Sequence, residues 1–155
     1  MHVIVATDGS RQSLVAVRQF MAFADPAKVT EVSVVAVVSP LAAVPFANEL
    51  GGERPDDPTR LSFREEAQAA TGTVMAELQD WGVTSVHRRI LSGSPAVEIV
   101  KAARESSADL IVVASGSGGL SDTILLGSTA SRVQHSAPCP VLICRPTARS
   151  ERATG

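Results

Sequence analysis

Residues 2–10, HVIVATDGS, contain the junction that decides the fold. His2–Ala6 is a short, continuous run rich in β-branched residues, which is typical of a strand buried on both faces. The residues that follow, Thr7–Ser10, combine turn-forming and helix-capping side chains. From Ser10 the apolar residues recur with the helical period until Asp25 and Pro26. The stretch therefore predicts a strand that turns directly into an amphipathic helix.

The rest of the chain repeats this alternation of aliphatic strand and helix. Further strands are expected at 31–38, 84–91, 109–114 and 138–144, and further helices at 60–81, 95–105 and 128–136. Residues 39–59 hold four prolines and are expected to form a long surface loop. The pattern predicts one three-layer α/β domain over residues 1–146, with a parallel sheet covered on both faces. Residues 147–155 are expected to be a frayed tail.

The composition excludes several classes of protein. The chain is 45% hydrophobic and 3% aromatic, with a formal net charge of −2. A strongly basic nucleic-acid binder would need a surplus of Lys and Arg, and a single-strand binder would need aromatic rings for stacking, so no nucleic-acid partner is expected. No apolar run reaches ~18 residues and no signal sequence opens the chain, so we expect a cytoplasmic protein without a membrane partner.

The sequence predicts neither a catalytic nor a metal site. Its three histidines are far apart, no His/Cys cluster has metal-ligand spacing, and no Walker loop or GxSxG elbow is present. The two cysteines, Cys139 and Cys144, lie five residues apart in the last predicted strand. This odd spacing places them on opposite faces, so they are expected to be packed thiols rather than a disulfide. An enzyme is not expected.

Two loops are candidates for ligand binding, because ligands of open α/β sheets bind beyond the carboxyl ends of the strands. One is Ala6–Ser10, after the first predicted strand. The other is Ala114–Ser128, after the fourth, which holds four of the chain's 11 glycines. A glycine-rich backbone can approach a phosphate closely, and a helix that starts at Ser128 adds the positive end of its dipole.

Several segments of the chain resemble the universal stress protein family. They are HVIVATDGSRQS at 2–13, GSPAVEI at 93–99, ADLIVVAS at 108–115 and LLGSTASRVQHSAPCPVLICR at 125–145. The resemblance covers about residues 1–145 and implies a five-stranded parallel sheet in the order 3-2-1-4-5. It also implies a homodimer joined through the last strand, at Val141, Leu142 and Ile143. One branch of this family binds ATP, with Mg²⁺ when ATP is bound, and another branch does not.

The nucleotide-binding branch carries the motif G-x2-G-x9-G-[ST], whose spacing this chain keeps. Gly127 and Ser128 match its end, whereas Ala114 and Ser117 replace its first two glycines. A non-glycine residue with positive φ is expected to cost about 1 kcal/mol. The loop also lacks a basic residue to hold a phosphate. Its other glycines, Gly116 among them, offer the same backbone freedom one residue out of register.

The resemblance implies an adenine-nucleotide site at the ends of the first and fourth strands. Its expected residues are Ala6, Thr7, Asp8, Val37, Val113, Ala114, Ser115, Gly116, Ser117, Gly127, Ser128 and Thr129. Structural roles stay open for three of them: Asp8 as a helix cap or turn residue, Val37 as a core residue and Ser128 as a helix cap. Arg132, one turn after Ser128, is expected to reach a phosphate. The alternative function is a dimer of the branch that does not bind nucleotides, acting through protein partners.

Overall fold

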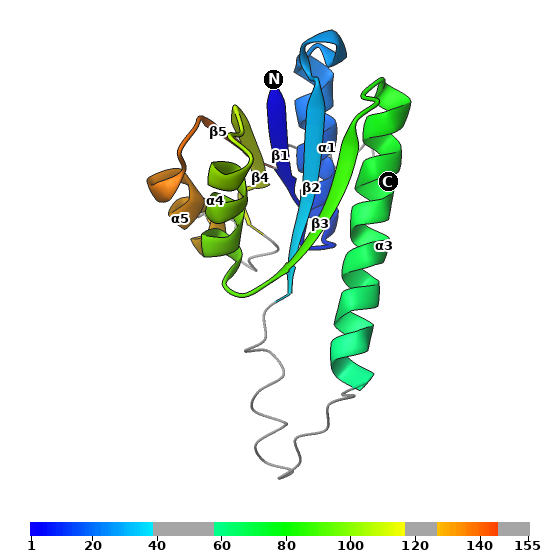
Figure 1. Cartoon of the computed structure of the whole chain (residues 1–155), viewed down its shortest axis with the longest axis vertical. Helices are drawn as coiled ribbons and strands as arrows, with labels where there is room; N and C mark the ends of the chain where they lie inside the picture. The colour runs from blue at the N-terminus through cyan, green and yellow to red at the C-terminus, as the bar shows by residue number, and fades with distance from the viewer. Residues whose placement is uncertain (39–57, 117–126, 146–155) are drawn as a thin grey trace.

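The computed structural model describes residues 1–38, 58–116 and 127–145 of the chain. Its elements, in chain order, are β1 (His2–Ala6), α1 (Arg11–Phe23), the 3-10 turn η1 (Pro26–Lys28), β2 (Glu31–Val38), α3 (Pro58–Trp81), β3 (Val86–Ser92), α4 (Pro95–Glu105), β4 (Leu110–Ala114), α5 (Ser128–Ser136) and β5 (Val141–Cys144). Strands and helices alternate as the sequence pattern predicts (Figure 1).

All five strands are parallel and lie in the order β3-β2-β1-β4-β5, which confirms the predicted sheet. The central strand is β1, where Val3 pairs with Val32 of β2 on one side and with Leu110 of β4 on the other. The chain moves outward from β1 through β2 to β3, and then returns to build β4 and β5 on the opposite side. The reversal places the topological switch point between the carboxyl ends of β1 and β4.

Helices cover both faces of the sheet and enclose two separate cores. On one face, Val3 and Val5 of β1 pack with α1 and α3, which contribute Phe20 and Leu78. On the other face, Ile4 packs with residues of α4 and α5. Because alternate side chains of β1 enter opposite cores, the whole strand must be apolar, which explains its continuous aliphatic run. None of the helices described has both the length and the apolar character needed to cross a bilayer.

Several element boundaries differ from the sequence prediction, among them that of β4, which begins at Leu110 rather than at residue 109. The helix α3 begins at Pro58 rather than at residue 60, so the first two residues of this helix lie inside the predicted loop; proline is well suited to a first helical turn. The strand β5 begins at Val141 rather than at residue 138, because Pro138 and Pro140 cannot donate to a strand ladder. The strand β3 covers Val86–Ser92 instead of 84–91. The remainder of the predicted loop, 39–57, and the predicted tail lie outside the described residues.

Both cysteines are free thiols that pack toward opposite faces of the sheet, as predicted, although Cys139 lies before β5 and not within the strand. Cys144 is buried in the core beneath α1 and α3, whereas Cys139 packs against the core beneath α4 and α5. Burial raises the pKa of Cys144 to about 11. The pKa of Cys139 is also raised, first by burial and then by the nearby carboxylate of Asp109. Both thiols therefore stay protonated near neutral pH, where they are poor nucleophiles.

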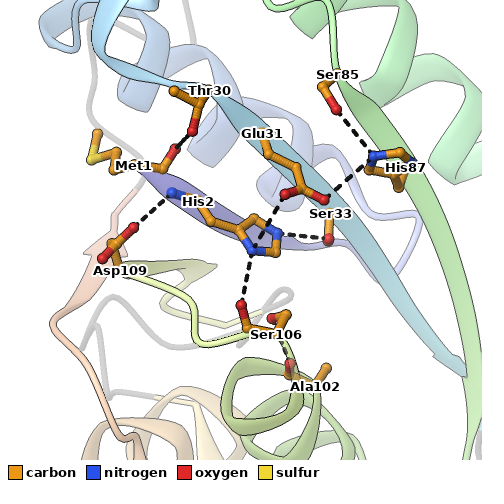
Figure 2. A network of polar contacts seen from close by, with 10 residues as sticks. All are labelled: Met1, His2, Thr30, Glu31, Ser33, Ser85, His87, Ala102, Ser106 and Asp109. Atoms are coloured by element: carbon orange, nitrogen blue, oxygen red, sulfur yellow. Dashed lines mark hydrogen bonds and ion pairs between the residues drawn. The ribbon is translucent and has the colours of Figure 1, made fainter.

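His2 forms polar contacts with three segments at the amino-terminal edge of the sheet (Figure 2). Its ring Nε2 lies 2.9 Å from the hydroxyl of Ser33 on β2, and its Nδ1 lies 3.3 Å from the carbonyl oxygen of Ser106, just after α4. Its backbone N–H donates to the carboxylate of Asp109 at 2.8 Å. One residue thus joins β1 to its neighbouring strand and to the connection that leads into β4.

Two histidines that are 85 positions apart in the chain meet at one carboxylate on this edge (Figure 2). Glu31 Oε1 lies 3.4 Å from Nε2 of His87, and Glu31 Oε2 lies 4.0 Å from Nδ1 of His2. Sequence distance concealed this pairing, because parallel strands bring remote residues into register. In the described part of the chain, no group of three or more His, Cys, Asp or Glu side chains is arranged to hold a metal ion.

Candidate functional site

The candidate site lies at the carboxyl edge of the sheet, where β1 and β4 are neighbours. The loop after β1 and the segment after β4 leave the sheet at this edge, where β2 also ends (lower edge of the sheet in Figure 1). The long helix α3 lies beside the sheet and extends past this edge. The topology therefore places the first predicted ligand-binding loop and the described ends of the second at one edge of the sheet, while residues 117–126 lie outside the described residues.

Thr7 organises the loop after β1. Its backbone N–H donates to the carbonyl of Val35 at 2.9 Å, and its hydroxyl accepts from the N–H of Gly9 at 3.2 Å. The hydroxyl of Ser13 donates to the carbonyl of Ser10 at 2.8 Å, so the Thr7 hydroxyl must donate to Ser13 Oγ, 2.9 Å away. The buried Thr7 hydroxyl is thus used within the loop.

Asp8 is an exposed turn residue at the mouth of the site. Its Oδ1 accepts from the N–H of Ser10 at 2.9 Å, which forms an Asx turn. The cap of α1 is provided by Ser10, whose hydroxyl accepts from the N–H of Ser13 at 3.2 Å. Of the two structural roles considered for Asp8, the turn is observed and the cap is not. Gly9 has φ of +79°, a conformation that favours glycine in this tight loop.

A pocket of about 530 Å³ opens between this loop, the end of β2 and the amino-terminal half of α3. Its volume lies within the usual range for small-molecule sites. It is lined by Thr7, Asp8, Gly9, Ala36, Val37, Val38, Phe63, Glu66, Ala67, Ala69, Ala70 and Thr73. Of the twelve predicted site residues, Thr7, Asp8 and Val37 line this cavity, and the other described ones do not. Its described lining carries two carboxylates and no basic side chain.

The contribution of α3 to the pocket was missed by the sequence prediction. Ala67 and Ala70 follow the same apolar helical stripe as Val74 and Leu78, and the helical period alone does not distinguish pocket residues from core residues. Only the two larger residues are buried in the core; the two alanines lie where α3 passes the end of the sheet. The change from Val and Leu to Ala along this stripe is the signal that could have located the pocket, because small residues leave space.

The backbone at the end of β4 is in close contact with the backbone at the start of α5. The N–H of Ser115 donates to the carbonyl of Cys144 at 2.9 Å, and the N–H of Gly127 donates to the carbonyl of Ser115. A Cβ at Gly127 would lie 2.8 Å from that carbonyl oxygen and 3.1 Å from Cα of Gly116. Gly127 is therefore required by this contact, and the contact sets the start of α5 beside the end of β4.

The expected strain from the lost motif glycines is not present at Ala114. This residue ends β4 in register with Cys144, and among the described residues only Ser107 combines a side chain with a positive φ. Gly116 is the residue of this segment with a positive φ, +155°. The chain keeps glycine where this part of the backbone needs it, so the predicted cost at Ala114 was wrong. Ser117 lies outside the described residues.

The first turn of α5 has no side-chain cap. Gly127 occupies the cap position, so the exposed Ser128 is the first helical residue and does not cap the helix, contrary to one predicted role. Half-buried Thr129 follows it. Arg132 lines a groove between α4 and α5, on the opposite face of the sheet from the pocket. The helix start, rather than Arg132, therefore provides free donors at the carboxyl edge.

The remaining predicted site residues lie in the sheet itself. Val113 is buried in the core beneath α4 and α5, and half-buried Ala6 packs against the same core. Val37 also packs partly against this core while it lines the pocket, so its two predicted roles are compatible. The side chain of Val113 is closed off from solvent, so only its backbone could contribute to a ligand site.

Comparison with known proteins gives consistent results. Residues 1–145 match the profile described as the universal stress protein family. Universal stress protein MJ0531 of Methanocaldococcus jannaschii is 38% identical over 148 residues, covering 92% of this chain and 81% of that protein. The solved structure of hypothetical protein MJ0577 is 28% identical, with a TM-score of 0.74 over 94% of this chain and 96% of that one. A universal stress protein solved in complex with cAMP is 26% identical, with a TM-score of 0.64 over 94% and 96% of the two chains.

Replacing Gly127 by Ala tests the close approach at the candidate site. The new methyl group would meet backbone atoms at 2.8 Å, so we expect the free energy of unfolding to fall by about 1–3 kcal/mol. Gly72→Ala, inside α3, is the control, because the new Cβ would meet only the flexible end of Arg88 from β3. It should raise the free energy by about 0.5–1 kcal/mol. Urea denaturation measures both changes, and an unchanged stability of the Gly127 variant would contradict the proposed packing.

Proposed function

This chain belongs to the universal stress protein family, and we propose that it is a regulatory member that binds an adenine nucleotide, ATP with Mg²⁺, at the carboxyl ends of β1 and β4. The observation that carries the proposal is the pocket lined by Thr7, Asp8 and Val37 at the same sheet edge as the uncapped start of α5. A related chain is described in complex with cAMP, a nucleotide with the same base.

The pocket suits the adenosine part of the ligand. Ala36, Val37 and Ala70 provide an apolar surface for a flat base, and Phe63 adds an aromatic ring. The exposed carboxylate of Asp8 can accept hydrogen bonds from ribose hydroxyls or from the amino group of adenine. The absence of basic residues from the described lining is compatible with a neutral nucleoside, since nothing in that part of the ligand requires a cation.

The phosphates would extend toward the start of α5. The N–H groups of its first turn have no side-chain cap, and Gly127 allows the start of α5 to lie directly beside the end of β4. A helix start stabilises an anion by about 0.3–1 kcal/mol, and a lost contact to a charged side chain removes about 1.5–3 kcal/mol. Without a basic side chain in this segment, we expect binding roughly ten- to a hundredfold weaker than with one. Mg²⁺ carried by the phosphates would supply the positive charge that this segment lacks.

A binding role is favoured over catalysis. In the described part of the site, Ser10 and Ser13 bond to one another and to the backbone of α1, and neither is paired with a histidine. Ser115 is buried, with its backbone N–H held by β5. A nucleophile needs a base within hydrogen-bond reach. We therefore propose that nucleotide occupancy regulates this protein and that turnover of ATP is at most slow.

Filling the pocket from α3 tests the nucleotide proposal. Ala67→Trp places an indole inside the lining, whereas Ala76→Trp places it at an exposed position on the same helix. We expect the pocket variant to bind ATP about tenfold more weakly or worse, because the indole occupies the space of the base, and the control to bind normally. Isothermal titration calorimetry with ATP and Mg²⁺ measures both affinities, and urea denaturation confirms that both variants fold.

Absence of heat and of a thermal shift with the unmodified protein at millimolar ATP would contradict the proposal. The alternative, a family member that acts through protein partners without a nucleotide, would then be favoured. Two features of the sequence support this alternative: Ala114 and Ser117 replace two motif glycines, and residues 114–128 contain no basic residue.

We also propose that the protein is a homodimer joined through β5. This strand lies at the edge of the sheet and pairs with β4 on one side only. The carbonyls of Pro140 and Cys144 face β4, where they accept from Ile111 at 3.0 Å and Ser115 at 2.9 Å. Because alternate residues direct their backbone groups to opposite edges, Val141 and Ile143 direct theirs outward. An aliphatic edge with free backbone groups is stabilised when a second copy covers it.

Proline at position 143 tests this dimer, because it removes an outward N–H while leaving the bonds to β4 in place. We expect the normal protein to have twice the 16.1 kDa mass of the chain and Ile143→Pro to have the mass of one chain. Ile143→Ala controls for the partial packing of this side chain and should remain dimeric. Light scattering after gel filtration measures the mass, and a monomeric unmodified protein would rule out the proposed dimer.

A further inference from the structure

We propose that the groove between α4 and α5 is a docking site for an acidic, amphipathic segment of a partner protein. The groove has a volume of about 710 Å³ and lies on the opposite face of the sheet from the nucleotide pocket. It is lined by Ala96, Val97, Val100, Lys101, Arg104, Ser131, Arg132, His135 and Ser136. The proposal does not depend on nucleotide binding.

Basic side chains from both helices converge on this groove. Lys101 and Arg104 come from α4, and Arg132 and His135 come from α5. The lining contains no acidic residue, although acidic residues outnumber Lys and Arg in the whole chain, 16 to 14. The groove is therefore a local basic surface on a chain with a net charge of −2.

These charges are not neutralised within the described structure. No carboxylate of the described residues forms an ion pair with any of the four basic side chains. The two acidic residues of α4 are directed elsewhere: Glu105 pairs with Arg89 at 3.0 Å, and Glu98 lies against Gly93. Arg104 donates to the carbonyl of Ser136 at 3.4 Å, which ties the two helices together. The remaining positive charge is available to a ligand with carboxylates.

The apolar residues of the groove, Ala96, Val97 and Val100, form a strip along α4 in which only Val97 is open to solvent. Ala96 and Val100 are 5% and 6% exposed, whereas Val97 is 59% exposed beside the basic residues. Val97 is among the few large hydrophobic side chains described as exposed. A surface that combines an uncovered aliphatic side chain with flanking cations suits a segment that presents an apolar side chain between carboxylates.

The dimensions favour a peptide segment over a nucleic acid. From Val97 to Arg104 the α4 side of the groove runs about 10 Å, the length of two helical turns. Three permanent cations in so short a surface are few for a nucleic acid, which requires a longer run of phosphate contacts. The side chains that supply the charge are exposed and flexible, unlike the fixed backbone donors of a phosphate site. A helical segment that binds along α4 and α5 would contact both the basic side chains and the apolar strip.

Binding of a designed peptide to charge-reversed variants tests the docking site. The probe is a fluorescein-labelled peptide of Glu and Leu at helical spacing, compared with Glu/Ser and Lys/Leu versions of the same length. We expect Lys101→Glu with Arg132→Glu to weaken binding of the Glu/Leu peptide by about tenfold or more. The matched control, Lys28→Glu with Arg88→Glu, makes the same charge change at exposed positions outside the groove and should leave the affinity within about twofold.

Fluorescence anisotropy gives the affinities, and amide chemical shifts of the ¹⁵N-labelled protein show where the peptide binds. Support requires shifts confined to α4 and α5 and clearly weaker binding of the other two peptides. Equal binding of the Glu/Ser peptide would overturn the role of the apolar strip. Displacement of the peptide by inorganic phosphate or by a DNA oligonucleotide would assign the groove to a different ligand. No detectable binding, or equal losses in both double variants, would also overturn the proposal.

Discussion

Burial of β1 on both faces is the constraint on which the rest of the structure depends. Val3, Ile4 and Val5 are each 0% exposed, and their side chains enter two different cores. A strand in this position needs an apolar layer on each face, and here helices that connect parallel strands supply both layers. The crossover helices then return every chain segment to the same edge of the sheet, so all the loops that follow the strands gather at the opposite edge. The candidate nucleotide site is a consequence of this arrangement.

Much of this fold could be predicted because the signals are local. The strand at 2–6 and the strand at 31–38 have the bounds that their aliphatic runs predict, and the helix at 95–105 begins at the proline that marks its first turn. The loop at the end of the first strand identified Thr7 and Asp8, and that inference needs only periodicity and the common rule that ligands lie at the carboxyl edge of a parallel sheet. Val37, a strand residue, was identified only through the resemblance to the universal stress protein family.

The features that could not be predicted arise from contacts between distant segments. Ala114 was expected to be strained, yet it continues a strand, and the unusual backbone conformation falls on Gly116. Gly127 is needed because it approaches Ser115, which no local pattern reveals. Ala67 and Ala70 of α3 line a pocket instead of the core because the helix extends beyond the end of the sheet. In each case the position of one segment relative to another decides the role of the residue.

The charge of the molecule is divided between its two faces in a way that the net charge conceals. The charged side chains of the described pocket lining are Asp8 and Glu66, whereas those that line the groove on the other face are all basic.

The central claim is that the edge between β1 and β4 is an adenine-nucleotide site. It is tested most directly by titrating the ¹⁵N-labelled protein with ATP and Mg²⁺ and following its amide resonances. The account predicts saturable shifts at Thr7, Asp8, Gly116 and Gly127. Saturation without shifts at these residues, or shifts confined to α4 and α5, would contradict it.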